Sequence, residues 1–413
     1  MKLKLRLTLM SFLQYAIWGS WLISLGAYLG GGLHFSGFQI GSFFATMGIA
    51  SLFMPAIMGI IADRWIPAQK VLGICHILAA AFLIAAAPQT QYGTLYPLVL
   101  LSVMFYMPTI ALSNSVAYNA LSLNGYDTVK AFPPIRVWGT VGFICAMILV
   151  DLLGFATTSY QFYLSAGLGL ILGIYSFTLP NCEVNKNVEK KSLVDSLGLR
   201  AFTLFKERKM AVFFIFAMLL GMSLQITNAY ANDYLTNYFG KISEYQGTFG
   251  VKHANILISL SQISETLCIL LIPFFLSRFG IKKVMLISMF AWVLRFGLLG
   301  LGNPGSGVWM LILSMIVYGV AFDFFNISGS LFVENETDAK IRSSAQGVFM
   351  IMTNGFGAFI GSYIAGLVVD ATGWPDAWFV FSAYSLVVAI VFAFVFKYKH
   401  NPKNSSTVSK AAQ

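Results

Sequence analysis

The sequence predicts an all-α membrane protein with twelve transmembrane helices arranged in two six-helix halves. Three observations predict it: composition, the distribution of positive charge, and an internal repeat. Of the 413 residues, 58% are hydrophobic and only 10% are charged, and the mean hydropathy is +0.76. A soluble domain would carry about a quarter charged residues. The apolar runs are about 20 residues long, which suits helices and is about twice the length of a transmembrane β-strand.

Twelve apolar runs can be placed along the chain. They cover residues 5–29, 39–62, 70–88, 95–118, 134–155, 159–180, 209–236, 254–277, 282–301, 308–333, 343–369 and 376–397. The first run follows a short basic segment and lacks a cleavage site of small residues. We therefore expect an uncleaved first helix rather than a signal peptide.

The 26 lysines and arginines are distributed unevenly over the loops. With the amino terminus inside, 22 of them fall on inner segments and only Lys241 and Lys252 on outer loops, while Arg136 and Arg295 lie within spans. This is the pattern of the positive-inside rule, and it predicts that both termini are cytoplasmic. The net charge of +10 therefore reflects topology, and we expect no nucleic-acid partner.

A polar segment divides the spans into two sets of six. We expect an N-terminal half over residues 1–180, a cytoplasmic linker over 181–208, a C-terminal half over 209–397 and a cytoplasmic tail over 398–413. Residues 192–205 of the linker could form an amphipathic helix on the membrane surface.

An internal repeat relates the two halves. The segment "LSVMFYMPTIALSN" (101–114) aligns without a gap with "LSMIVYGVAFDFFN" (313–326). The identical pairs are Leu101/Leu313, Ser102/Ser314, Tyr106/Tyr318 and Asn114/Asn326. Two six-helix halves in the same orientation are the parallel repeat of major facilitator transporters, whose substrate site lies at the midplane between the halves.

The loop after the second span, "GIIADRWIPAQK", partly matches the loop signature of that superfamily. Gly59, Asp63 and Arg64 are the matching residues. A functional interpretation is a cytoplasmic latch of charge pairs that forms and breaks as the halves move. The alternative is an ordinary basic inner loop.

Polar and aromatic residues follow one face of several spans. They are Arg136, Thr140 and Phe143 in the fifth span, Gln225 and Asn228 in the seventh, Gln262 and Glu265 in the eighth, and Tyr318, Phe322 and Asp323 in the tenth. Hydrogen bonds between helices could explain the neutral residues. Ionisable groups within spans are costly, and by default they indicate a transport pathway or a proton relay. Together the set suits a neutral, polar ligand with a planar or sugar face.

Other polar residues favour structural interpretations. Arg295 and His76 have no polar companions at helical spacing, so Arg295 could pair structurally or snorkel and His76 is interpreted as a packing residue. Asp151, Asp233 and Asp370 lie near helix ends, where we expect them to be solvated. No metal-ligand spacing and no convincing catalytic pair is found, so we expect neither a metal site nor an enzyme.

Several long runs carry a resemblance to a known family. They are "FPPIRVWGT" (132–140), "LQITN" (224–228), "SQISET" (261–266), "IPFFLSRFGIKKVM" (272–285), "VYGVAFDFFNISGS" (317–330) and "MTNGFG" (352–357). With them the chain resembles the bacterial nucleoside:proton symporters of the major facilitator superfamily. The resemblance implies a multi-pass protein of the bacterial inner membrane that imports purine and/or pyrimidine nucleosides with a proton by alternating access.

The resemblance also implies the roles of individual residues. The nucleoside site would comprise Arg136, Thr140, Phe143, Gln225, Asn228, Gln262, Glu265, Tyr318 and Phe322. Asp323 would be tied to proton coupling. As a mechanism we expect Asp323 to carry the proton, with Glu265 as the rival carrier, and movement of a nearby cation such as Arg136 to load and unload it. No cofactor is expected besides the co-transported proton, and the partners would be nucleoside and membrane lipid around a monomer. The alternative is a sugar:proton symporter of the same fold.

Overall fold

The computed structural model describes residues 2–182, 199–338 and 341–398, which form helices joined by short loops. The N-terminal half contains α1 (Leu3–Gly19), α2 (Leu25–Ala27), η1 (Tyr28–Gly32), α3 (Gly37–Arg64), α4 (Ala68–Ala86), α5 (Tyr92–Leu123), α6 (Thr128–Leu152) and α7 (Tyr160–Ser176). A short helix, η2 (Leu199–Lys206), precedes the C-terminal half. That half contains α9 (Arg208–Asp233), η3 (Tyr234–Tyr238), η4 (Phe239–Lys241), α10 (Phe249–Lys252), α11 (Ala254–Leu301), α12 (Val308–Glu336), α13 (Arg342–Met350), η5 (Ile351–Gly357), α14 (Ala358–Thr372) and α15 (Asp376–Val395).

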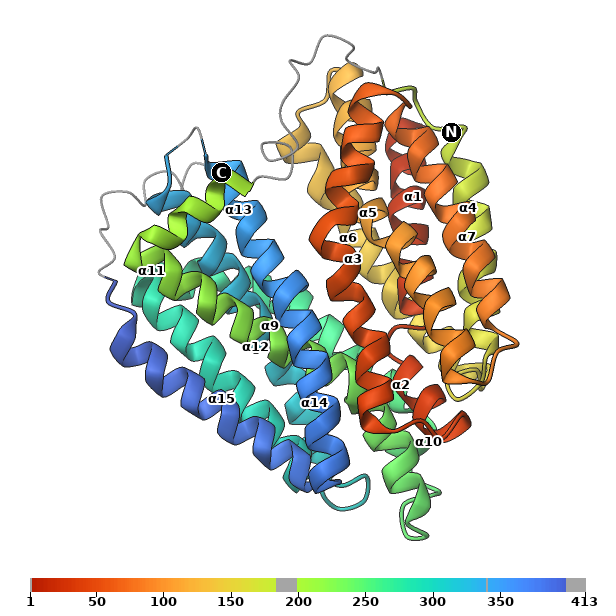
Figure 1. Cartoon of the computed structure of the whole chain (residues 1–413), viewed down its shortest axis with the longest axis vertical. Coiled ribbons are helices and arrows are strands. Elements are labelled where there is room, and N and C mark those ends of the chain that lie inside the picture. The colour runs from red at the N-terminus through yellow and green to blue at the C-terminus, as the bar shows by residue number, and fades with distance from the viewer. Residues whose placement is uncertain (1, 183–198, 339–340, 399–413) are drawn as a thin grey trace.

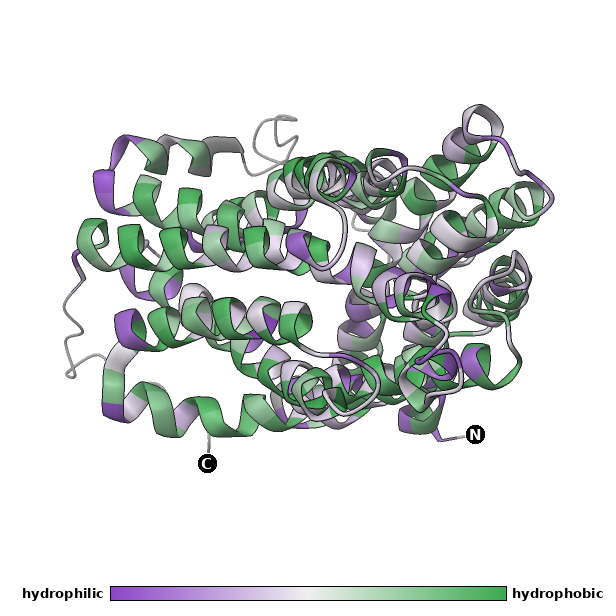
Figure 2. Cartoon of the chain, turned by 90° about the horizontal axis from the view of Figure 1, so that it is seen from below, coloured by the Kyte–Doolittle hydropathy of each residue, from purple (hydrophilic) through white to green (hydrophobic). Residues whose placement is uncertain are grey.

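The helices account for all twelve predicted spans. Nine helical segments in the described part of the chain are at least 18 residues long and apolar enough to cross a membrane. One of them, α11, covers two predicted spans. Gly280, with a φ of 74°, breaks α11 between these two spans. Helices α1 and α7 are 17 residues long and match the first and sixth spans. In Figure 2 most of the helical ribbon has the colours of hydrophobic residues, as expected for helices in lipid.

Two predicted segments fall partly or wholly outside the described residues. Of the predicted surface helix over 192–205, only the part from residue 199 onward is described, and it belongs to the 3₁₀ helix η2. Residues 399–413 of the predicted tail lie outside the described ranges.

The two halves meet at one end and diverge at the other. Figure 1 shows them converging at the bottom, whereas α1 begins near the top. The main contacts across the halves are those of α3 with α14 and with η5, of α6 with α11, and of α2 with α9. Because the distribution of positive charge predicts a cytoplasmic amino terminus, the closed end is the outer one and the structure faces inward.

Close backbone contact holds α3 against α14 at the outer end. The backbone N–H groups of Gly37 and Phe38 donate to the carboxylate of Asp370, at 2.6 and 2.8 Å. The hydroxyl of Tyr230 donates to the carbonyl of Gly37 at 2.8 Å. Further along α3, a Cβ on Gly41 would lie 2.2 Å from the carbonyl oxygen of Ser362. Only glycine therefore permits this approach, and we call the α3–α14 contact the outer seam.

A second outer contact corrects an expectation from the sequence. Asp151, which we expected to be solvated, has a side chain that is only 2% exposed. Its carboxylate lies 2.6 Å from Nδ1 of His253 and accepts from the backbone N–H of Asn255. The expectation was wrong because the end of α6 in one half is covered by the start of α11 in the other.

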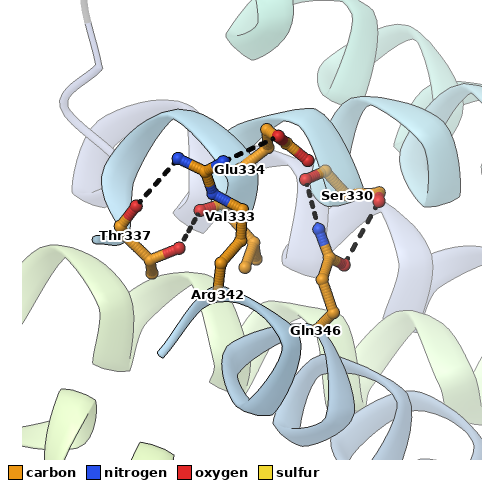
Figure 3. A network of polar contacts seen from close by, with 6 residues as sticks. All are labelled: Ser330, Val333, Glu334, Thr337, Arg342 and Gln346. Carbon is orange, nitrogen blue, oxygen red and sulfur yellow. Dashed lines mark hydrogen bonds and ion pairs between the residues drawn. The ribbon is translucent and has the colours of Figure 1, made fainter. Parts of the chain in front are cut away.

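Polar contacts also lock neighbouring helices within one half. Figure 3 shows Arg342 and Gln346 of α13 reaching the end of α12. Arg342 donates to Glu334 at 3.1 Å, and Gln346 donates to the carbonyl of Ser330 at 2.7 Å. Side chains that bond the last carbonyls of a helix stabilise its end. These contacts hold α13 against the end of α12.

The outer seam leads to a direct prediction about stability. We expect Gly41→Ala to destabilise the closed seam by about 1–3 kcal/mol, because the added methyl group overpacks a backbone contact. The matched control is Gly59→Ala on the same helix, where an added Cβ meets nothing within 4 Å. Thermal unfolding in detergent checks the prediction, which fails if Gly41→Ala unfolds at the same temperature as the control or higher.

Candidate functional site

A cavity of about 600 Å³ lies between the two halves. Its walls come from α1, α3 and α5 of the N-terminal half and from α9, α13 and η5 of the C-terminal half. It extends from Trp18 and Gln225 in the middle of the molecule to Ala56 and Gly347 near the inner ends of their helices. This position, between halves that are closed on the outside, is that of an inward-facing binding cavity.

Carboxamide side chains supply much of the polar wall of this cavity. They belong to Asn114, Gln225, Asn228 and Asn354. Within the described chain, Oε1 of Gln225 is buried without a hydrogen-bond partner. Among the described residues, the side chain of Asn354 has one polar contact, at 4.0 Å to the sulfur of Met350. Because buried polar groups are normally paired, these donors and acceptors are available to a ligand.

A group of charged side chains lies beside the cavity rather than on its wall. Arg136 of α6 places its guanidinium 3.9 Å from the ring centre of Tyr15. Glu265 of α11 interacts electrostatically with Arg136, and Asp323 of α12 interacts with Glu265. Arg136 and Glu265 come from opposite halves and form no ion pair within 4.0 Å. The charges therefore face each other across the interface between the halves without touching.

Asp323 has no compensating partner in the part of the chain that the structure describes. The residue is 4% exposed, and its Oδ2 atom is buried without a hydrogen bond. An ionised carboxylate in such a place is costly unless it is paired. These surroundings suit a carboxyl group that is protonated, and so neutral, in one step of a transport cycle and ionised in another.

Aromatic rings lie next to the charged group. The rings of Tyr318 and Phe322 stack with their centres 5.8 Å apart and their planes 10° apart. The side chain of Gln262 lies beside the Tyr318 hydroxyl, and the guanidinium of Arg295 lies 4.6 Å from the centre of the same ring. Tyr318 is thus held from two sides.

The predicted site residues fall into separate groups. Gln225 and Asn228 line the main cavity. Phe322 lines a small neighbouring cavity that shares Leu224 and Asn354 with the main one. Five residues form the charged and aromatic group: Arg136, Gln262, Glu265, Tyr318 and Asp323.

Two predicted site residues and the predicted latch lie apart from these groups. Thr140 is partly buried one turn beyond Arg136, and Phe143 is buried with its backbone against Gly19. The latch residues Gly59, Asp63 and Arg64 lie at the inner end of α3.

Arg295 belongs to the site and was not selected from the sequence. It is fully buried and donates to the carbonyl of Ser314 at 2.6 Å, with Thr227 and Ser261 each at 3.5 Å. Its companions lie on α9, on α12 and on the part of α11 before the break at Gly280, so helical spacing around residue 295 carried no signal. The polar partner of His76 also lies on another helix, since its Nε2 atom lies 2.8 Å from Oε1 of Gln14.

The internal repeat has a structural explanation. The hydroxyl of Ser102 donates to the carbonyl of Ala79 at 2.9 Å, and that of Ser314 donates to the carbonyl of Arg295 at 3.1 Å. Each repeated serine thus joins its helix to the preceding one in the same half. The repeat conserves a packing contact.

The repeat also shows where the halves differ. Asn114 lines the main cavity, and its counterpart Asn326 lines the neighbouring one. Asp323 has Ala111, a residue of the cavity wall, as its counterpart. The cavity wall is therefore shared between the halves, whereas the carboxylate is present in one half only.

The described residues contain no group of three or more His, Cys, Asp or Glu that could hold a metal ion. Two six-helix halves around a central cavity, closed at one end, define a membrane transporter of the major facilitator fold. Residues 1–401 match the model of the family described as "Nucleoside H+ symporter". The chain belongs to this family, which is one of transporters and not of enzymes.

Individual relatives agree with this assignment. The chain is 51% identical to the xanthosine permease of Escherichia coli K12 over 98% of both chains. It is 50% identical to the nucleoside permease NupG of the same strain, over 99% of this chain and all of the relative. The crystal structure of the nucleoside transporter NupG superimposes with a TM-score of 0.91 at 50% identity, covering 97% of this chain and 100% of the other.

Proposed function

We propose that the chain imports nucleosides together with protons across the bacterial inner membrane. The observation that carries the proposal is the set of unpaired carboxamides in the inward-facing cavity, in a member of the nucleoside H+ symporter family. Asn and Gln side chains can donate to and accept from the edge of a nucleobase at the same time. Purine and pyrimidine bases both offer such edges.

Alternating access follows from the two halves. In the outward-facing state the site takes a nucleoside and a proton, and in the inward-facing state it releases both. Tyr318 and Phe322 supply a flat face for the base, and Glu265 accepts hydrogen bonds from ribose hydroxyls. The cavity lies between two halves of one chain, so a monomer forms a complete transport unit. The inner end of α3, with Asp63 and Arg64, serves as the latch when the inner side closes.

Asp323 carries the proton in this scheme. Protonation neutralises the buried carboxylate and so lowers the cost of passing through a closed, dry intermediate. Arg136 faces Glu265 across the interface, so movement of the halves changes the field that both carboxylates experience. One proton with a neutral nucleoside moves one net charge, and a potential of 100 mV adds about 2.3 kcal/mol to the driving force.

Competition for uptake tests the substrate class. In proteoliposomes with an acidic exterior, we expect unlabelled adenosine and uridine to compete with labelled nucleoside, whereas free ribose and sucrose do not. Liposomes without protein are the control. Competition by the sugars and none by either nucleoside would instead support a sugar:proton symporter of the same fold.

A further inference from the structure

Another pocket, smaller than the main cavity, lies at the inner ends of α9 and α15. It has a volume of about 250 Å³ and is lined by Arg208, Lys209, Val212, Val395, Phe396 and Lys397. None of these residues lines the transport cavity. Because α9 begins and α15 ends on the cytoplasmic side, the pocket opens at the cytoplasmic surface of the membrane.

The pocket carries an excess of positive charge. Of its three cations only Lys209 is paired: its amine lies 2.5 Å from the carboxylate of Glu336 and 5.0 Å from the ring centre of Tyr398. Arg208 and Lys397 form no ion pair or hydrogen bond with any described residue. Two cations whose side chains have no partner among the described residues therefore border one pocket.

The start of α9 adds to this positive field. The first backbone bond into the helix runs from the N–H of Ala211 to the carbonyl of Glu207, and the Glu207 side chain does not cap the helix. The preceding N–H groups are thus left without helical acceptors next to the pocket. The amino end of a helix also favours anions through its dipole.

Below the cations the pocket continues into apolar surface. Val395, Val391 and Val387 are spaced four residues apart on α15 and are 42%, 44% and 59% exposed. On α9, Ile215 lies one turn beyond Val212 and is 45% exposed. These residues run from the pocket toward the middle of the membrane, on the surface that faces lipid hydrocarbon. The ligand that fits both parts has an anionic head and hydrocarbon tails.

We propose that this pocket binds the phosphate of an anionic phospholipid from the cytoplasmic leaflet. Arg208 and Lys397 hold the phosphate, and the acyl chains lie along Val395, Val391 and Ile215. Basic pockets at the cytoplasmic ends of membrane helices are suited to such head groups. The pocket borders the first helix and the last helix of the C-terminal half, so a bound lipid joins the two ends of that half.

Native mass spectrometry of the full-length, detergent-solubilised protein tests the proposal with phosphatidylglycerol, phosphatidylcholine and inorganic phosphate as probes. We expect phosphatidylglycerol to bind the wild type and to bind Arg208→Ala/Lys397→Ala at least about tenfold more weakly, since each cation near the surface contributes to anionic lipid binding. The matched control is Lys130→Ala/Lys283→Ala, which removes two exposed cations elsewhere on the inner side and should bind as the wild type does.

Several results would overturn the proposal. The first is equal phosphatidylglycerol binding by the wild type and Arg208→Ala/Lys397→Ala. The second is binding of phosphatidylcholine as tight as that of phosphatidylglycerol. The third is full displacement of the lipid by millimolar inorganic phosphate, which would indicate a site for free anions. Thermal unfolding of each variant checks that it is folded. If the alanine variant does not fold, Arg208→Gln/Lys397→Gln tests the same loss of charge with less loss of volume.

Discussion

Asp323→Asn is expected to abolish nucleoside accumulation driven by a pH gradient while leaving nucleoside exchange intact. Asparagine has nearly the shape of protonated aspartate but cannot release a proton, so the variant mimics the loaded carrier permanently. Exchange requires only that the loaded carrier reorients. The measurement is uptake of labelled adenosine into proteoliposomes with an acidic exterior, alongside counterflow into vesicles preloaded with unlabelled adenosine.

Glu265→Gln is the comparison that separates the two carboxylates. In the proposed scheme Glu265 contacts the ribose, so its amide variant loses affinity in both accumulation and exchange. Full-rate accumulation by Asp323→Asn would contradict the assignment of the proton carrier. Loss of accumulation with intact exchange in Glu265→Gln alone would transfer that role to Glu265.

Arg136→Ala is expected to weaken nucleoside binding by about a hundredfold, because a hydrogen bond to a charged group contributes roughly 1.5–3 kcal/mol. The substitution also leaves Glu265 without its counter-charge across the interface. Arg136→Lys should recover only part of the loss, since an ammonium group lacks the planar fork of the guanidinium and its stacking on Tyr15. Isothermal titration of the purified variants with adenosine gives the affinities.

The control for this series is Arg278→Ala, which removes an exposed arginine from the helix that carries Glu265. It should bind adenosine as the wild type does. Binding by Arg136→Ala within about twofold of the control would show that the guanidinium does not contact the substrate.

Much of the fold could be predicted from the sequence, because each membrane helix needs a long apolar run whatever it packs against. The irregularities could not. In the first span the regular helix ends at Gly19. The hydroxyl of Ser20 donates to the carbonyl of Ala16 and so competes with the backbone hydrogen bonds of the helix. The π-helical turn η5, which brings Asn354 to the cavity, is also invisible in a pattern of apolar residues.

The site was predictable where its residues follow one helix and not where they depend on contacts between helices. Spacing along single helices selected Gln225 and Asn228, which do line the main cavity. Spacing gave no reason to choose Arg295, whose partners come from α9, from α12 and from the part of α11 that precedes the break at Gly280. It also misjudged Asp151, because the segment that buries it is about a hundred residues away in the sequence.

Proton movement caused by nucleoside tests the central claim most directly. Wild-type proteoliposomes containing a pH-sensitive dye, with no imposed gradient, receive adenosine on the outside. The account predicts that the interior acidifies when adenosine is added, that sucrose has no such effect, and that Asp323→Asn gives no acidification although it still exchanges nucleoside. Adenosine entry into wild-type vesicles without any change in internal pH would contradict proton symport.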